Sequence, residues 1–260
     1  MRLKNQAVLV TGSASGIGKA IALKCAREGA SVAVADLDVE GVEQTSEAIR
    51  SFNGVSLSVA MDVTDEKSVE DGVDFVHRTY GRIDVLVSNA GVQQIGAVVD
   101  LSFYDWKRVL AVHLDGSFLT TRATMRHMVA DGQGGTILYM GSVHSKAASP
   151  LKAPYVTAKH GLLGLCRTVA REGSAHGIRS NVICPGFVRT PLVEKQIPEQ
   201  AAELGISEER VIQDNMLRHT VDGEFTTTAD VAETALFLAT FPSSAMTGQA
   251  IIVSHGWHME

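Results

Sequence analysis

Cysteine is scarce in this chain, and its placement argues against two kinds of site. The 260 residues include 3 cysteines, at Cys25, Cys166 and Cys184. They are odd in number, lie far apart and form no C-x-x-C pair, so neither a disulfide framework nor a zinc site is supported. The 9 histidines show no H-E-x-x-H spacing, and we expect no metal site. The cysteines are predicted to be small buried hydrophobes.

A basic excess and a long apolar run are also missing. The formal net charge is −6, so no basic stripe is available to neutralise the phosphates of a nucleic acid or a membrane surface. No stretch approaches the ~20 apolar residues that span a bilayer, and the amino terminus lacks a signal-peptide pattern. We therefore expect a cytoplasmic protein whose partners are small molecules, not nucleic acid or membrane.

Aromatic residues are few, at 5%, although 45% of the residues are hydrophobic. Many of these are Val, Ala, Leu and Ile, which suits a parallel sheet covered by helices on both faces. Helix-length stretches alternate with seven strand-like runs: 6–10, 31–35, 55–60, 84–88, 136–140, 180–184 and 249–253. This alternation predicts right-handed crossovers and a parallel sheet. We expect one α/β domain over residues 1–260, without repeats or linkers.

One region departs from this regular alternation. Between residues 189 and 227, prolines and glycines punctuate short helical pieces such as 207–216. Loops of this kind often cover an active site. A mobile lid over the site is one interpretation of 189–227, and a plain surface excursion is the other.

A glycine-rich loop follows the first apolar run. It contains Thr11, Gly12, Ser15, Gly16, Ile17 and Gly18, and a helical pattern begins directly after it. Glycines let a backbone turn sharply and approach a pyrophosphate, while the unpaired N–H groups of a helix start favour negative charge. The loop therefore predicts a phosphate cradle, although a tight strand-to-helix turn would use similar residues.

Tyr155 and Lys159 are four residues apart, so on a helix they project from one face. A tyrosine hydroxyl titrates near pH ~10, and an adjacent ammonium group favours the phenolate and lowers the phenol pKa. Such a pair is more often an ordinary surface contact. Ser142, at the end of an apolar run upstream, and the glycine loop favour a proton-transfer site instead.

These motifs together resemble the short-chain dehydrogenase/reductase family. The T-G-x-x-x-G-x-G loop, Asn89-Ala90-Gly91, Ser142, the Tyr155/Lys159 pair and Pro185-Gly186 occur in the family order over nearly the whole chain. The resemblance implies a Rossmann-type, doubly wound parallel sheet of seven strands in the order 3-2-1-4-5-6-7, with cofactor and substrate at its carboxyl edge. It also implies a symmetric homotetramer, for which the apolar residues Leu162, Leu165 and Val169 are suitable.

Asp36 closes the second predicted strand and indicates which cofactor binds. A carboxylate at that position hydrogen-bonds the ribose hydroxyls of NAD and repels a 2′-phosphate. No Arg lies near it to receive a phosphate, so NAD is predicted, although a helix-capping or turn aspartate is the alternative. By resemblance, the other cofactor contacts are Asp62, Val63, Asn89, Ala90, Gly91, Pro185, Gly186, Val188 and Thr190, together with Tyr155 and Lys159. As bare sequence, Asp62 would be a turn residue.

The same resemblance implies the catalytic roles. Tyr155 takes the proton of a substrate hydroxyl as hydride leaves the carbon, Lys159 lowers the pKa of Tyr155, and Ser142 positions the substrate oxygen. The family usually has Asn where this chain has His113. His113 either preserves the role of that Asn through its backbone carbonyl, serves a different proton relay, or is a core histidine.

The run from Cys184 to Gln196 resembles the D-3-hydroxybutyrate dehydrogenase branch of the family. The implied activity is NAD-dependent oxidation of (R)-3-hydroxybutyrate to acetoacetate. In this branch, the positions of Gln94, His144, Lys152 and Gln196 hold the substrate carboxylate, and that of Trp257 closes the pocket. Taken singly, these residues would be surface amides, a loop histidine, a solvated lysine and a tryptophan over a subunit contact.

Two other functions stay open from the sequence. One is the oxidation of another secondary alcohol, such as a longer 3-hydroxy acid or a sugar alcohol. The other is a non-catalytic dinucleotide sensor, although a sensor would not need Ser142, Tyr155 and Lys159 together.

Overall fold

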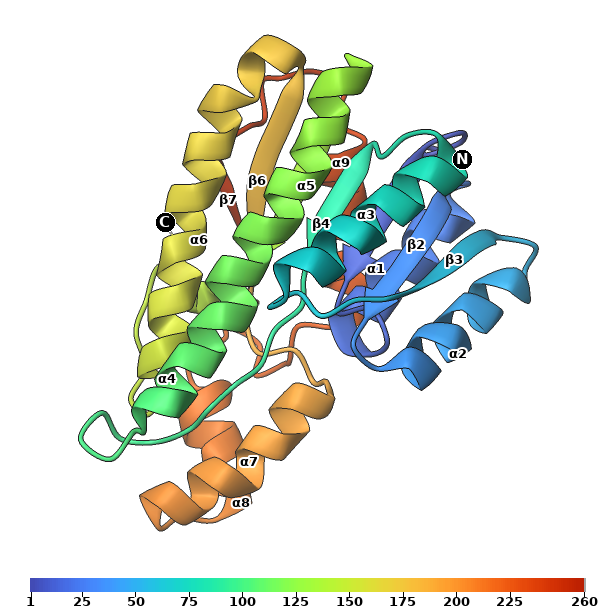
Figure 1. Ribbon diagram of the computed structural model, residues 1–260. Coiled ribbons are helices and arrows are strands. Elements are labelled where there is room, and N and C mark those ends of the chain that lie inside the picture. The colour runs from blue at the N-terminus through green and yellow to red at the C-terminus, as the bar shows by residue number, and fades with distance from the viewer. Residues whose placement is uncertain (260) are drawn as a thin grey trace.

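A computed structural model describes residues 1–259 and shows a seven-stranded parallel sheet in the order β3-β2-β1-β4-β5-β6-β7 (Figure 1). The predicted order and strand positions are confirmed. The strands are β1 (Ala7–Thr11), β2 (Ser31–Asp36), β3 (Val55–Ala60), β4 (Val85–Ser88), β5 (Gly135–Met140), β6 (Ile178–Pro185) and β7 (Ala250–Val253).

The helices that connect the strands begin at side-chain caps in several places. Asp38, Asp65, Ser102 and Thr227 each accept a hydrogen bond from a backbone N–H of the turn that follows, which satisfies donors that a helix start leaves free. The α-helices are α1 (Gly16–Arg27), α2 (Val39–Arg50), α3 (Glu66–Tyr80), α4 (Phe103–Leu110), α5 (Gly116–Asp131), α6 (Ala153–Glu172), α7 (Pro191–Leu204), α8 (Glu208–Arg210) and α9 (Thr228–Ala239). Short π and 3-10 segments are η1 (Ala111–Asp115), η2 (Val143–Ser145), η3 (Ser174–His176) and η4 (Val211–Met216).

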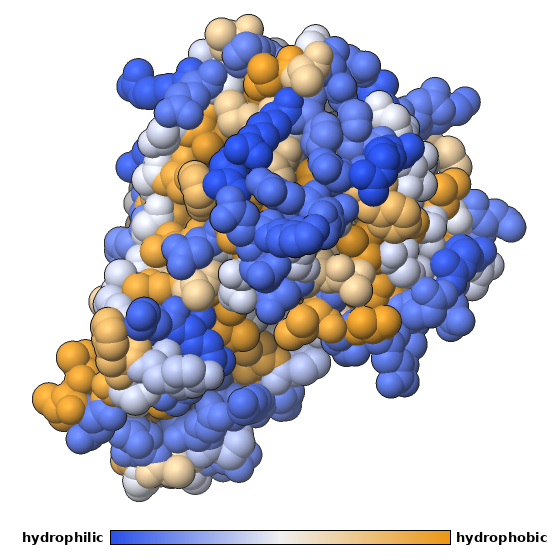
Figure 2. All heavy atoms as spheres, viewed as in Figure 1, coloured by the Kyte–Doolittle hydropathy of each residue, from blue (hydrophilic) through white to orange (hydrophobic). Residues whose placement is uncertain are grey.

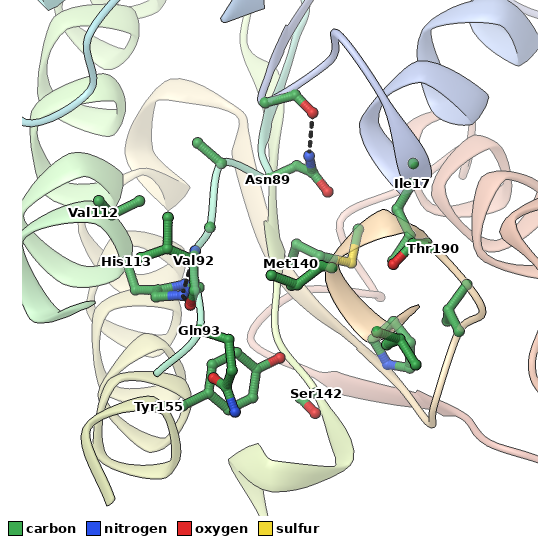
Figure 3. Close-up of a pocket in the computed structure, with 18 of the residues that line it drawn as sticks. Ile17, Asn89, Val92, Gln93, Val112, His113, Met140, Ser142, Tyr155 and Thr190 are labelled. Atoms are coloured by element: carbon green, nitrogen blue, oxygen red, sulfur yellow. Dashed lines mark hydrogen bonds between the residues drawn. The ribbon is translucent and has the colours of Figure 1, made fainter. Parts of the chain in front are cut away.

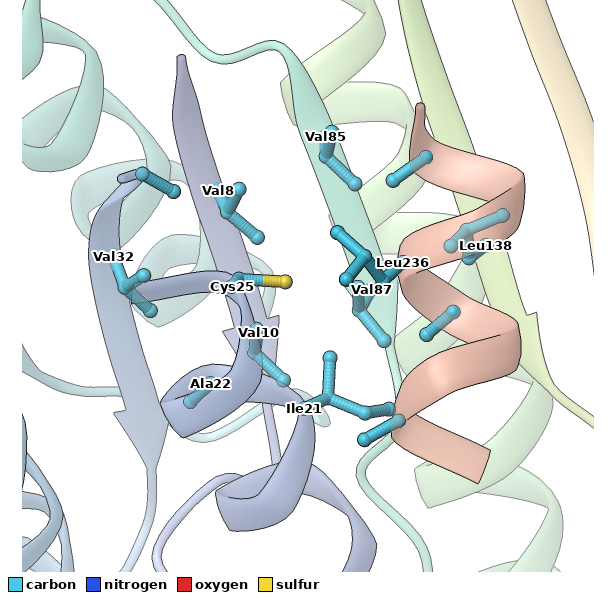
Figure 4. Packing of buried hydrophobic residues seen from close by; sticks show 14 of the residues in the cluster. Val8, Val10, Ile21, Ala22, Cys25, Val32, Val85, Val87, Leu138 and Leu236 are labelled. Carbon is cyan, nitrogen blue, oxygen red and sulfur yellow. The ribbon is translucent and has the colours of Figure 1, made fainter. Parts of the chain in front are cut away.

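Helices cover both faces of the sheet because successive strand residues point to opposite sides. Val8 and Val10 pack toward α1, α2 and α9, as Figure 4 shows for Ile21 and Leu236. Leu9 lies in a second core with residues of α3, α5 and α6. The two apolar layers confirm the doubly wound arrangement, in which the sheet is buried on both sides.

The three cysteines are free and buried, as predicted. Leu162 and Val169 differ from the prediction, because they belong to the core layer between α6 and the sheet and are 1% and 4% exposed. They are therefore not available to a subunit contact, and the homotetramer itself stays a prediction. Within residues 1–259, no helix combines the length and apolar character that a bilayer crossing requires.

The surface over α3 and α5 is mostly hydrophilic (Figure 2). Arg122 and Arg126 on α5 pair with Glu70 on α3 at 3.3 and 3.0 Å, so ion pairs bridge the two helices. Larger apolar side chains are exposed around the start of α4, where Val99, Phe103 and Tyr104 are largely open to solvent.

The carboxyl ends of β1, β2, β4, β5 and β6 meet at one edge of the sheet, and α7 lies beyond that edge (Figure 1). The region predicted to be irregular is more regular than expected, because α7 continues through Pro198. A small core containing Val193, Ile197 and Met216 joins α7 to η4. The space between α7 and the sheet edge forms the site.

Candidate active site

A pocket of about 430 Å³ lies at the carboxyl edge of the sheet, and most of the predicted site residues line it. Figure 3 shows Tyr155 and His113 on one side and Ile17 and Thr190 on the other. The predicted residues in its wall are Gly12, Ser15, Gly16, Ile17, Asp36, Asp62, Val63, Asn89, Ala90, Gly91, His113, Ser142, His144, Lys152, Tyr155, Lys159, Pro185, Gly186, Val188, Thr190 and Gln196. Thr11, Gly18, Gln94 and Trp257 lie outside this wall.

The glycine loop forms a cradle held from behind by the end of β4. Gly12 has a φ of +64°, and a Cβ there would lie 2.6 Å from the Cα of Ala90. Asn89 Nδ2 donates to the carbonyls of Thr11 and Gly12, at 2.9 Å each, and Thr11 Oγ1 accepts from the N–H of Asn89. Thr11 therefore supports the cradle from within the sheet instead of lining the pocket.

The start of α1 suits an anion. Its N-cap, Ser15, makes no side-chain cap bond, and the first turn carries no acidic residue. Both Ser15 and Gly16 line the pocket, so the free N–H groups and the positive end of the helix dipole face it. This cradle fits the pyrophosphate of a dinucleotide.

Asp36 stands where β2 ends and contributes to the pocket wall. Its Oδ2 accepts from the N–H of Ala14 and its Oδ1 from that of Asp38, both at 3.1 Å. The cap of α2 is Asp38, so the helix-capping interpretation of Asp36 does not hold. Asp62 lines the same end of the pocket, and its Oδ1 also accepts from the N–H and hydroxyl of Thr64 in a turn.

Ser142, Tyr155 and Lys159 come together where β5 meets the start of α6. Ser142 follows β5 and caps η2, while Tyr155 and Lys159 lie one turn apart on α6 and both face the pocket. Lys159 Nζ donates to the carbonyl of Met140 at 2.5 Å and lies 5.3 Å from the centre of the Tyr155 ring.

Burial is the largest influence on the pKa values of Tyr155 and Lys159. Burial raises the pKa of Tyr155 to about 12, and the hydroxyl of Ser142 opposes this shift. Burial also lowers the pKa of Lys159 to about 7. Desolvation accounts for both shifts, and the effect of Lys159 on the pKa of Tyr155 stays a prediction.

His113 lies in the π-helical turn η1, directly beside the catalytic tyrosine candidate. Its ring packs edge-on against Tyr155, with centroids 5.4 Å apart. Nε2 lies 2.8 Å from the carbonyl of Val92 and 3.2 Å from its N–H, so the tautomer of the ring decides whether Nε2 donates to the carbonyl or accepts from the N–H. Burial lowers the pKa of His113 to about 3, so the ring is neutral. Through its contact with Val92, the ring of His113 connects η1 to the segment that follows β4 in the wall of the pocket.

His144 is the centre of an aromatic cluster that includes Tyr155. Its ring lies 5.7 Å from Trp257 and 6.0 Å from both Phe187 and Tyr155, measured between centroids. Trp257 packs behind His144 and Phe187 and is half-buried. It supports the wall from outside instead of forming part of it.

Lys152 is 3% exposed and is the residue before α6. Its Nζ lies 4.6 Å from the centre of the Phe187 ring, and burial lowers its pKa to about 8. In residues 1–259, no carboxylate lies within ion-pair distance of this nitrogen. The interpretation as a solvated loop lysine is wrong.

Gln94 does not line the pocket. Its side chain accepts from Arg108 and donates to the carbonyl of Ile95, whereas the neighbouring Gln93 lines the pocket, and its buried Oε1 has no hydrogen-bond partner among residues 1–259. The role predicted for Gln94 stays a prediction. Gln196 is 6% exposed and lines the pocket, with its Nε2 donating to Leu192.

The arrangement defines a class of enzyme. A dinucleotide cradle, a buried Tyr–Lys–Ser group and a neighbouring wall that includes Phe187, His144 and Lys152 suit hydride transfer between a bound nicotinamide and a small secondary alcohol or ketone.

Comparison with known proteins identifies the family. A family model described as Enoyl-(Acyl carrier protein) reductase matches residues 12–258, and the chain belongs to the short-chain dehydrogenase/reductase family of oxidoreductases. Membership of this family implies a nicotinamide dinucleotide cofactor, NAD or NADP.

Two curated relatives and one solved structure show how far the similarity extends. The D-beta-hydroxybutyrate dehydrogenase of Rhizobium meliloti (strain 1021) is 40% identical over 253 residues, covering 96% of this chain and 97% of that protein. The (3R)-3-hydroxyacyl-CoA dehydrogenase of Rattus norvegicus is 34% identical over 267 residues, covering 100% and 98%. A crystal structure of a short-chain type dehydrogenase/reductase from Mycobacterium marinum has a TM-score of 0.90 and 30% identity, covering 99% of this chain and 97% of that one.

Gly91→Ala tests the packing of His113. A Cβ at Gly91 would lie 2.5 Å from Cε1 of His113, so the buried ring must move, and we expect a loss of about 1–3 kcal/mol in the free energy of unfolding. Urea denaturation measures this loss. Gly164 on α6 is the control, since a Cβ there meets nothing within 4 Å and Gly164→Ala should stabilise the helix by up to ~1 kcal/mol. Equal effects of the two substitutions would contradict the assigned packing.

Proposed function

We propose that this protein is an NAD-dependent dehydrogenase that oxidises (R)-3-hydroxybutyrate to acetoacetate. The single observation that carries the proposal is the buried amine of Lys152, which faces the end of the pocket without an acidic partner among the described residues.

A buried ammonium group without a counter-ion is costly, because a low-dielectric surrounding opposes the charge. The lowered pKa of Lys152, about 8, expresses that cost. An anionic substrate removes it by forming a charge-assisted hydrogen bond. A carboxylate fits this role, whereas the neutral thioester of an acyl-CoA would leave the amine uncompensated.

The surroundings of Lys152 favour a short acid. Gln93 and Gln196 line the same pocket and present amide groups that can orient a carboxylate. Val143, Phe187 and Leu192 complete the wall with apolar surface, which suits a methyl group better than a polyhydroxylated sugar chain. The D-beta-hydroxybutyrate dehydrogenase relative supports the same substrate.

The chemistry of the site follows from the placement of its hydroxyl groups. Pro185, Gly186 and Thr190 line the pocket and would hold the nicotinamide, which would supply the hydride acceptor and a positive charge that favours the phenolate of Tyr155. Tyr155 takes the proton of the substrate hydroxyl as the base, and Ser142 donates a hydrogen bond to the same oxygen. Lys159 lies beside Tyr155 and would hydrogen-bond the ribose next to the nicotinamide.

Two further assignments complete the proposal. Asp36 accounts for the choice of NAD, because its carboxylate meets the adenosine ribose and repels a 2′-phosphate. The segment 189–227 acts as a lid, since α7 supplies Leu192, Val193 and Gln196 to the pocket and is joined to the rest of the segment by its own small core.

Asp36→Ala should narrow the preference between the two cofactors. We expect strong preference for NAD in the unmodified protein, and removal of the charge should improve the relative use of NADP by roughly ten- to a hundredfold. The ratio of kcat/KM for NAD and NADP measures this change. Asp214→Ala, an exposed carboxylate on η4, should leave the ratio unchanged. Equal use of both cofactors by the unmodified protein would refute the role of Asp36.

Tyr155→Phe should lower kcat by about 10²–10⁴ because only the proton-transfer hydroxyl is lost. Binding of NADH, followed by its fluorescence, should be preserved. Tyr104→Phe is the control, since Tyr104 is 74% exposed and lies on α4. If the Tyr155→Phe protein kept most of its turnover, another residue would have to be the base.

Lys152→Met should lower kcat/KM for 3-hydroxybutyrate by roughly ten- to a hundredfold, since a charge-assisted hydrogen bond is lost. In the unmodified protein, Lys152 is charged below its pKa of about 8 and neutral above it. The ratio of kcat/KM for the acid to that for its methyl ester should therefore fall as the pH rises through 8, and the ratio cancels the titration of Tyr155.

The control for this experiment is Lys195→Met, because Lys195 is an exposed lysine of α7. Its substitution should change neither kcat/KM nor the pH dependence of the ratio. Equal rates with the acid and the ester, or with both enantiomers, would leave only an unspecified secondary-alcohol dehydrogenase.

A further inference from the structure

The turn that leads into α6 contains a strained backbone at Leu151. Its φ is +66°, in the left-handed region that residues with a side chain rarely adopt. Within residues 1–259, the other positive-φ residues that are not glycine are Asn5, Asn53 and His255. Asparagine tolerates this conformation because its side chain bonds locally to the backbone. A leucine gains no such compensation, so its surroundings must hold it in place.

The turn is held by its own sequence and by one backbone hydrogen bond. Pro150 precedes Leu151, and proline followed by a positive φ is typical of a type II turn, in which glycine usually takes the second position. The carbonyl of Leu151 accepts from the N–H of Gly96 at 3.1 Å. Gly96 belongs to the segment that carries Gln93 into the pocket wall. The bond therefore relates the position of the turn to that of Gln93.

Lys152 is the residue that follows this turn, and its amine is buried at the pocket. The side chain is 3% exposed, and its Nζ lies 4.6 Å from the centre of the Phe187 ring. A lysine at the start of a helix ordinarily extends its amine into water, because burial of an ammonium group is costly. An inward direction for Lys152 therefore needs a backbone that is fixed on both sides.

The two sides are α6 and the turn. Leu162 and Val169 pack α6 against the sheet, so the helix does not move to follow Lys152. The φ of Leu151 sets the direction in which the chain leaves Pro150. A negative φ there would displace Lys152 or break the hydrogen bond from Gly96.

We propose that Leu151 is a positioning residue for substrate binding: its left-handed backbone, bonded to Gly96, holds the amine of Lys152 inside the pocket. This role deepens the proposed function and rests on it. Strained residues cluster at ligand-binding sites, where the surrounding structure stabilises them. The strain at Leu151 is of this kind, because the next residue supplies the cation that meets the substrate carboxylate.

Leu151→Pro removes the conformation, because proline locks φ near about −65°. It deletes no hydrogen bond, since the N–H of Leu151 donates none within residues 1–259. The ratio of kcat/KM for (R)-3-hydroxybutyrate to that for its methyl ester should fall by roughly tenfold or more, because the charge-assisted hydrogen bond is lost. Leu151→Gly, which adopts a positive φ without steric cost, should keep the ratio. NADH absorbance measures both rates.

Asn5→Pro is the matched control. Asn5 also has a φ of +66°, is exposed and precedes β1, so it lies at the edge of the sheet opposite the pocket. The same change of φ at this position should leave the ratio unchanged. An unchanged ratio in Leu151→Pro, or an equal loss in Leu151→Gly, would overturn the proposal.

The reactivity of the Lys152 amine gives a second readout that does not depend on activity. Trace acetylation with acetic anhydride, quantified by peptide mass spectrometry, compares Lys152 with Lys195, whose side chain is 75% exposed. Acetylation of Lys152 should be slow in the unmodified protein, in Leu151→Gly and in Asn5→Pro. It should rise roughly tenfold in Leu151→Pro, whose folding circular dichroism checks.

Equal acetylation of Lys152 in the unmodified protein and in folded Leu151→Pro would contradict the role of Leu151. If Leu151→Pro does not fold, Leu151→Gly decides, since fast acetylation of Lys152 in that variant overturns the proposal and slow acetylation supports it. Unmodified protein inactive on (R)-3-hydroxybutyrate would refute the proposed function, and the acetylation result would then decide whether Leu151 holds Lys152.

Discussion

The hydrogen bond from Lys159 to the carbonyl of Met140 joins the helix that carries the reactive side chains to the strand that carries Ser142. Because Met140 ends β5 and Lys159 is on the second turn of α6, this bond sets the distance between the helix start and the strand end. Apolar packing of the same helix, through Leu162 and Val169, holds the rest of α6 against the sheet. Together, this hydrogen bond and the packing of α6 fix the position of Tyr155 relative to Ser142.

Burial of the side chains around Tyr155 also determines the electrostatics of the pocket. The carboxylates of Asp36 and Asp62 lie in its wall toward the glycine cradle, while Lys152 and Lys159 lie near Tyr155. Water is largely excluded from the second group. Burial therefore raises the pKa of Tyr155 and lowers the pKa values of Lys152 and Lys159, which favours the neutral form of each side chain. A charged ligand at this end interacts strongly with the buried lysines, because the surroundings have a low dielectric constant. The part of the pocket lined by Lys152 therefore determines which substrates bind.

Much of the fold could be predicted because its signals are local. Seven short apolar runs marked the strands, and the glycine loop marked the start of α1. The direction of a side chain was harder to predict. Gln94 and Gln93 are chemically identical, and only the three-dimensional structure shows that Gln93 lines the pocket while Gln94 bonds Arg108. Leu162 and Val169 read as an apolar stripe, which fits a subunit contact and a sheet contact equally well.

Residue type and spacing alone determined the strand positions, the cradle and the chemical identity of the Ser142, Tyr155 and Lys159 group, since these follow from short motifs along the chain. The sheet order followed from the family resemblance that those motifs carry. Tertiary structure decided how these groups titrate and which neighbours they have. A pKa depends on how much water surrounds a group and on which charges face it, and both are set by segments distant in sequence. Lys152 beside Phe187 and His113 edge-on to Tyr155 are contacts of this kind, which no pattern in the chain encodes by spacing.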